Sequence, residues 1–152
     1  MQASEGGSPL SSTSRQASSR PGVDFEALFE RSPNPYVVLD RDLVIVWMNE
    51  SSLQATGRTH AGIVGRGIFE AFPSDPQSQS FRQLRSSFDR VLESGETDEM
   101  AHIRYDIEQG DGTMVERYWS ATHTPLKDES GAVTHILQHT VDISELHELR
   151  GM

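Results

Sequence analysis

The sequence has no cysteine among its 152 residues. This absence excludes disulfide bonds, thiolate metal ligands, thiol nucleophiles and photochemistry through a cysteinyl adduct. Long apolar runs are missing as well. The longest, Leu43–Met48, has six residues, far fewer than the roughly 20 that a membrane-spanning helix needs. The sequence therefore predicts a protein without cysteine chemistry and without a membrane helix.

Positive charge is scarce, because 23 acidic residues stand against 13 basic ones and the net charge is −10. Binding to a phosphate backbone or to an anionic membrane needs a basic surface, so we expect neither nucleic acid nor membrane among the partners. The N-terminal segment also lacks the basic and then apolar pattern of a secretion signal. We therefore expect a cytoplasmic protein.

The composition changes sharply near residue 23. The first 22 residues include seven serines and no aromatic residue, and such a segment buries too little apolar surface to offset the entropy of ordering. We predict a disordered Ser/Gly-rich tail over 1–22, one domain over 23–142, and the start of a C-terminal helix over 143–152.

Hydrophobic periodicity predicts a mixed α and β domain. Helices are expected over 25–31, 49–55 and 81–92, the last beginning after Ser78 or Ser80 and ending at Gly95. Strands are expected over 35–40 and 43–49, joined by a tight turn, and over 102–107, 113–126 and 132–141. A short polar helix is expected from Ser144 to Arg150. This order fits an α+β fold in which a five-stranded antiparallel sheet carries helices over one face.

Four short motifs occur in this order along the predicted elements. They are Asn49 with Thr56-Gly57, Ile63-Val64-Gly65-Arg66, Pro125-Leu126-Lys127-Asp128 with Gly131, and Val141-Asp142-Ile143-Ser144. Together they resemble the PAS domain family over about residues 23–146, and most closely the sensory PAS/PAC modules of bacterial two-component sensor histidine kinases. The resemblance implies the strand order 2-1-5-4-3 and a non-enzymatic role in signal transduction.

PAS relatives often hold a small molecule between sheet and helices. In flavin-binding relatives the residue two positions before the closing aspartate points inward, and this position is Thr140 here. Strand alternation then adds other residues to the same face. The candidate ligand pocket consists of Trp47, Asn49, Leu84, Phe88, Trp119, Ala121, His123, Ile136, Gln138 and Thr140. The alternative is a closed core in which His123 and Gln138 satisfy each other.

The identity of a cofactor stays open at this point. Cysteinyl-flavin photochemistry is excluded, whereas non-covalent flavin and haem are alternatives, with His123 or His102 as the iron ligand. Residues 67–95 contain no histidine, although oxygen-sensing relatives place their haem ligand on or near that helix. His135 and His139 would lie roughly 13 Å apart on one strand, so no metal site is predicted. No catalytic constellation is evident, and an enzyme is not expected.

The resemblance also implies a route for the signal. A homodimer, or the helices flanking the domain, would pass it in trans to a histidine kinase or response regulator. The candidate dimer and signalling face consists of Phe25, Leu28, Phe29, Leu137, His139, Val141 and Asp142.

His147 begins a His-Glu-Leu-Arg stretch that matches the phosphoacceptor box of histidine kinases. The Thr-Pro-Leu-like continuation of that box does not follow it in this sequence. We interpret the stretch as an ordinary charged helix start, and a truncated histidine kinase fragment stays as the alternative.

Overall fold

The computed structural model describes residues 22–109 and 111–151, so all of the predicted disordered tail except Gly22 lies outside the described residues. The elements, in chain order, are α2 (Phe25–Arg31), β1 (Tyr36–Asp40), β2 (Ile45–Met48), α3 (Glu50–Thr56), α4 (His60–Ile63), α5 (Ile68–Ala71), α6 (Gln79–Ser94), β3 (Asp98–Arg104), β4 (Ile107–Glu108), β5 (Met114–Val115), β6 (Tyr118–Lys127), β7 (Val133–Asp142) and α7 (Ser144–Gly151).

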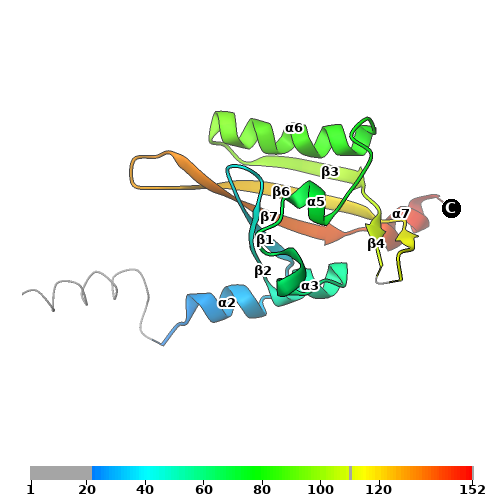
Figure 1. Cartoon of the computed structure of the whole chain (residues 1–152), viewed down its shortest axis with the longest axis horizontal. Coiled ribbons are helices and arrows are strands. Elements are labelled where there is room, and N and C mark those ends of the chain that lie inside the picture. Colours follow the sequence, from blue (N-terminus) through cyan, green and yellow to red (C-terminus); the bar gives the residue numbers. More distant parts are fainter. Residues whose placement is uncertain (1–21, 110, 152) are drawn as a thin grey trace, which may run out of the picture.

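Five of the strands form one antiparallel sheet with the order β2-β1-β7-β6-β3. This confirms the predicted strand order, because the three long C-terminal strands lie beside the N-terminal hairpin. The long helix α6 lies alongside β3 and covers one face of the sheet (Figure 1). In the described residues, the core lies between this face and the helices α3 to α6, and includes Leu39, Ile45, Ile63, Phe88 and Ile136.

Local sequence explains the bounds of α6. The Ser78 side chain accepts a hydrogen bond from the Phe81 backbone N–H at 3.2 Å, which begins the helix. Gly95 ends it in the left-handed conformation, with φ of 70°. Leu84, Phe88 and Val91 are buried on the face that the hydrophobic spacing predicts.

The third and fourth predicted strands differ from the observed ones. β3 begins at Asp98 and ends at Arg104, and the following residues form a separate two-stranded hairpin, β4–β5. The chain turns away from the sheet at Asp106, whose carboxylate pairs with Arg104 at 3.1 Å and accepts from the Arg117 N–H at 3.3 Å. The predicted strand over 113–126 is interrupted at Glu116 and Arg117, which separate β5 from β6, and β6 starts only at Tyr118.

A β-bulge changes which face two residues of the N-terminal hairpin occupy. Val38 pairs with Trp47 but Leu39 pairs with Ile45, so Val46 is the extra residue. Ile45 and Met48 are therefore both buried, whereas Trp47 points outward. There its ring stacks on His60 at 3.8 Å, and its Nε1–H donates to Glu30 at 2.7 Å. This corrects the prediction that Trp47 faces the pocket.

The two flanking helices lie at the edges of the domain. α2 packs beside α3 and has no buried residue, and α7 contacts β6 without burying a residue either. Within the described residues, no helix combines the length and apolar character that crossing a bilayer requires. Both α2 and α7 are thus held by few contacts, and segments with few buried contacts open or shift more easily than the core.

Candidate functional site

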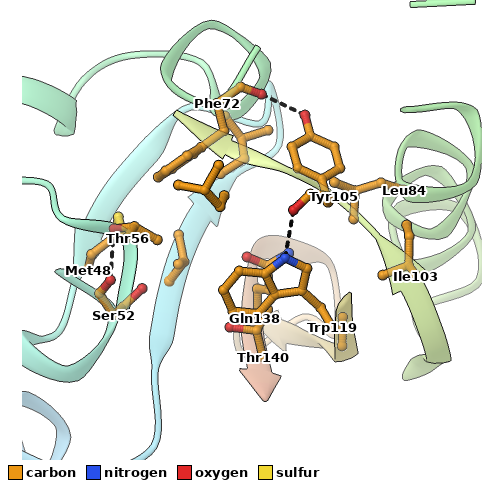
Figure 2. A pocket seen from close by; sticks show the side chains of 14 residues that line it. Met48, Ser52, Thr56, Phe72, Leu84, Ile103, Tyr105, Trp119, Gln138 and Thr140 are labelled. Carbon is orange, nitrogen blue, oxygen red and sulfur yellow. Dashed lines mark hydrogen bonds between the residues drawn. The ribbon is translucent and has the colours of Figure 1, made fainter. Parts of the chain in front are cut away.

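A cavity of about 70 Å³ lies between the sheet and the helices α3, α5 and α6. Figure 2 shows its walls, to which side chains of β1, β2, β3, β6 and β7 also contribute. The lining residues are Val37, Met48, Ser52, Thr56, Ile68, Phe72, Leu84, Ile103, Tyr105, Ile107, Trp119, Ala121, Gln138 and Thr140. Most of the wall is apolar, and the polar groups are few, which is typical of a small-molecule site.

Half of the candidate pocket residues lie on this cavity, and the other half do not. Those that line it are Leu84, Trp119, Ala121, Gln138 and Thr140. Phe88 and Ile136 are fully buried in the closed part of the core, Asn49 lies at a junction of backbone segments, and His123 lies behind Gln138. The wall residues from β1, β3 and α3 were not predicted from the sequence, although the spacing of Val37 and Leu39 places both on the inner face of β1.

Several polar groups of the wall already have partners. The Trp119 Nε1–H donates to the Tyr105 carbonyl at 2.8 Å, and the Tyr105 hydroxyl donates to the Phe72 carbonyl at 2.6 Å (Figure 2). Burial raises the pKa of Tyr105 to about 12, so this phenol stays a neutral donor. These bonds fix the wall where the chain enters β4, and they leave these groups unavailable to a ligand.

Three other polar side chains on the wall are free to bind. Ser52, Thr140 and Gln138 line the cavity, and the two hydroxyls and the Oε1 atom of Gln138 form no hydrogen bond with the residues that the structure describes. Each accepts a hydrogen bond, and the two hydroxyls also donate one. The cavity therefore offers apolar contact over most of its surface and two or three directional contacts.

A buried chain of hydrogen bonds begins at Gln138 and leads out of the core. His123 Nε2 lies 3.0 Å from Gln138 Nε2, and His123 Nδ1 lies 2.7 Å from the Ser87 hydroxyl. Ser87 donates its single proton to Asp98, since a carboxylate only accepts. Ser87 must then accept from His123 Nδ1–H, which leaves Nε2 to accept from the Gln138 amide. His123 and Gln138 therefore do hydrogen-bond to each other, as the alternative of a closed core predicted. The cavity is nevertheless present beside them.

The outer end of this chain is an ion pair at the surface. Arg90 contacts both carboxylate oxygens of Asp98, at 3.1 and 2.9 Å. The hydrogen bonds from Arg90 keep the pKa of Asp98 below its usual range, and burial lowers the pKa of His123 to about 4. Asp98 is thus ionised and His123 neutral at physiological pH, as the proton count requires.

The residues present do not fit haem or flavin in this conformation. Both ring nitrogens of His123 have protein partners, so this residue is not available as an iron ligand. His102 Nε2 faces His147 instead of the core. The cavity of about 70 Å³ is also far smaller than the roughly 300–1,000 Å³ of sites for drug-sized ligands.

Some residues of the candidate dimer and signalling face pack together, and others are exposed. Phe29 stacks on Tyr36 at 5.6 Å, and Tyr36 packs against His139 at 5.3 Å, so this part of α2 covers the outer face of the sheet. Leu137 is half-buried there, whereas the residues left exposed are Phe25, Leu28, Val141 and Asp142. Asp142 pairs with Arg117 at 3.4 Å and accepts from the Ser144 N–H. Among the described residues, the buried Nε2 atom of His139 has no hydrogen-bond partner.

Comparison with known families agrees with the fold and the strand order. The family described as PAS fold matches residues 29–148. The chain belongs to the PAS fold family. No curated protein sequence matches the chain significantly.

Solved PAS structures resemble the whole domain. A PAS domain from Colwellia psychrerythraea has a TM-score of 0.65 and 17% identity, with 80% of this chain and 95% of that chain covered. A sensory box sensor histidine kinase from Vibrio cholerae has a TM-score of 0.54 and 21% identity, with coverages of 90% and 97%. An RNA-binding light-oxygen-voltage receptor has a TM-score of 0.62 and 22% identity, with 86% of this chain covered. The chain spans only 37% of that receptor structure. Identities this low show the shared fold.

Proposed function

We propose that this PAS domain is a sensory module that binds a small, largely apolar molecule in the cavity. The observation that carries the proposal is the apolar wall with three acceptor side chains, Ser52, Gln138 and Thr140, whose oxygens have no partner among the described residues. A cavity of about 70 Å³ is smaller than the roughly 150 Å³ of an engineered cavity that admits benzene. The ligand that fits without rearrangement has only a few heavy atoms, with one polar group directed at these side chains.

Gln138 is the residue through which cavity and surface are coupled in this proposal. Its amide lines the cavity and also contacts His123, the first member of the buried chain to Ser87, Asp98 and Arg90. A ligand that donates to the free Oε1 atom of Gln138 shifts the same amide group whose Nε2–H donates to His123, and so alters that hydrogen bond. Because Ser87 and Arg90 lie on α6 and Asp98 lies on β3, such a change alters the contact between this helix and the sheet.

A haem or flavin redox sensor is the alternative that the family resemblance raised. Both ring nitrogens of His123 already form hydrogen bonds, and the cavity is too small for either cofactor, so the structure does not favour this alternative. The absorption spectrum of the purified protein decides the point, since a Soret or flavin band would refute the apolar-ligand proposal. One similar structure is described as RNA-binding, but the net charge of −10 does not favour a polyanion as partner.

Filling the cavity is expected to abolish ligand binding. Ala121→Leu adds three carbon atoms directly at the wall, whereas Ser120→Leu makes a comparable addition on the opposite face of β6 and serves as the matched control. In a thermal-shift screen of small alcohols, ketones and short-chain acids, the native protein and Ser120→Leu should share the stabilising compounds. Ala121→Leu should lose them. Equal stabilisation of Ala121→Leu would contradict the proposed site.

The output is proposed to act in trans, through a homodimer and a histidine kinase or response regulator. Phe25 and Leu28 on α2 and Val141 on β7 are exposed apolar side chains, and contact with a second copy would remove them from water. We expect a dimer in sedimentation equilibrium and at least a tenfold weaker dimer for Leu28→Glu. A native chain that stays monomeric at high micromolar concentration would contradict this part of the proposal.

Phosphotransfer through His147 has no support from the geometry. The His147 ring stacks on Tyr118 with centroids 3.6 Å apart, and its Nδ1 atom lies 3.1 Å from His102. The ring is therefore engaged in holding α7 against the sheet.

A further inference from the structure

Two histidines that are 45 positions apart in the sequence meet at the outer edge of the sheet. His102 on β3 and His147 on α7 approach each other with Nε2 and Nδ1 at 3.1 Å. Both rings pack on Tyr118 of β6, the His147 ring with a centroid distance of 3.6 Å and the His102 ring with 5.2 Å. The pair thus bridges two strands and the C-terminal helix.

This geometry matches the bite of a transition-metal ion. Two imidazole nitrogens that each lie about 2.0–2.1 Å from one metal are about 2.9 Å apart at a right angle and about 3.3 Å apart at the tetrahedral angle. The observed 3.1 Å falls between these values. Neutral histidine binds metal through the unprotonated nitrogen. Without metal, one of the two facing nitrogens carries a proton and donates it to the other. Metal binding would replace this hydrogen bond and move that proton to the ring nitrogen that faces away.

Acidic and basic side chains both lie near the pair. Arg104 pairs with both Asp106 at 3.1 Å and Glu116 at 3.4 Å, and Arg82 and Arg90 of α6 line the same surface hollow as His102. The Tyr118 hydroxyl contacts the same Glu116 carboxylate at 3.2 Å. The two nitrogens and their separation, and not the local charge, are therefore what would hold a metal here.

We propose that His102 and His147 form a two-histidine clamp for a divalent transition metal such as Cu²⁺, Ni²⁺ or Zn²⁺, and that the metal fastens α7 to the sheet. Nitrogen ligands and an open coordination sphere suit these ions, with Cu²⁺ bound most tightly. Within the described residues, no group of three or more metal-binding side chains occurs, so water or a partner completes the coordination. This proposal concerns the outer edge and does not depend on the cavity.

The clamp would act on a helix that is otherwise weakly held. α7 has no buried residue. It is held by the His147 stack on Tyr118, by the hydrogen bond between His147 and His102, and by the Ser144 hydroxyl, which accepts from the Tyr118 N–H at 2.9 Å. A metal bound by both His102 and His147 adds a link between β3 and α7. The helix could then leave the sheet only after a metal–nitrogen bond breaks. The metal therefore changes how often α7 leaves the sheet.

The test titrates the full chain with CuCl₂, NiCl₂ or ZnCl₂ under isothermal calorimetry, together with His102→Gln, His147→Gln and the control His135→Gln. We expect one metal per chain, at least about tenfold weaker binding for each of the first two variants, and unchanged binding for the control. Amide exchange over Ser144–Gly151 should slow with metal in the native chain and in the His135→Gln control, but not in His102→Gln or His147→Gln. Binding that survives both variants, or exchange that the metal leaves unchanged, overturns the proposal.

A second readout needs no variant. Substoichiometric Cu²⁺ should broaden the NMR signals of Tyr118, His102 and His147 before those of His60, which stacks on Trp47 away from the pair. Broadening that begins elsewhere, or no broadening at all, would equally overturn the clamp.

Discussion

Asn49→Ala is expected to lower the free energy of unfolding by about 3 kcal/mol or more. The Asn49 side chain is fully buried and makes four hydrogen bonds. Its oxygen accepts from the backbone N–H groups of Tyr36 and Ser52, at 2.9 and 3.1 Å, and its amide donates to the carbonyls of Phe29 and Asn34, both at 2.9 Å. A buried group that loses its partner costs about 1–3 kcal/mol, and urea denaturation at constant m-value measures the total.

Two variants control this result. Asn34→Ala changes an exposed neighbour and should alter stability by less than about 0.5 kcal/mol. Asn49→Asp keeps both acceptor bonds but removes the two donor bonds, so it should also be clearly destabilised. A loss of less than about 1 kcal/mol in Asn49→Ala would show that this residue does not join α2, β1 and α3 as the structure indicates.

Acid is expected to destabilise the protein through His123. Burial lowers the pKa of His123 from 6.5 to about 4, so the unfolded chain binds a proton between these values and the folded chain does not. Stability is therefore full above pH 6.5 and falls as the pH drops toward 4. Each pKa unit of difference between the unfolded and the folded chain corresponds to 1.36 kcal/mol. The free energy of unfolding should therefore fall by about 3 kcal/mol.

The effect of His123 on stability can be distinguished from that of the charged groups around it. Asp98 on β3 and Arg90 on α6 are the charged groups that act on this ring. The lowered pKa of Asp98 adds stability that is lost only in still stronger acid. His123→Leu should remove most of the slope between pH 6.5 and 4.5, and the ring protons of His123 in the native protein should titrate near pH 4. An unchanged slope, or titration of this ring near pH 6.5, would contradict the buried neutral state.

The fold could be predicted from the sequence because its signals are local and repeated. Leu84, Phe88 and Val91 show helical spacing, and Trp119, Ala121 and His123 show strand alternation, and each of these patterns places its residues on the buried face. The bulge at Val46 has no such signal, since it depends on how β1 and β2 pair. It alone moved Trp47 from the predicted inner face to the outer one.

The site could be predicted only in part, because its remaining members come together through tertiary contacts. Asn49 matches a PAS motif, yet its role is to satisfy backbone groups of segments that meet only in the fold. Tyr105 reaches the cavity wall because the chain leaves the sheet after Arg104. His102 and His147 show no metal-like spacing, since 45 positions separate them.

The most direct test of the cavity as a binding site is methyl NMR of the chain under xenon pressure. Xenon enters dry apolar cavities, so the methyl signals of Met48, Ile68 and Ile103, which line the cavity, should shift in the native protein and in Ser120→Leu. Those of the exposed Val64 and Val141 should not shift. In Ala121→Leu the cavity signals should stay unchanged. If the cavity methyl signals did not shift with xenon in the native chain, or shifted equally in Ala121→Leu, the cavity would not be the binding site.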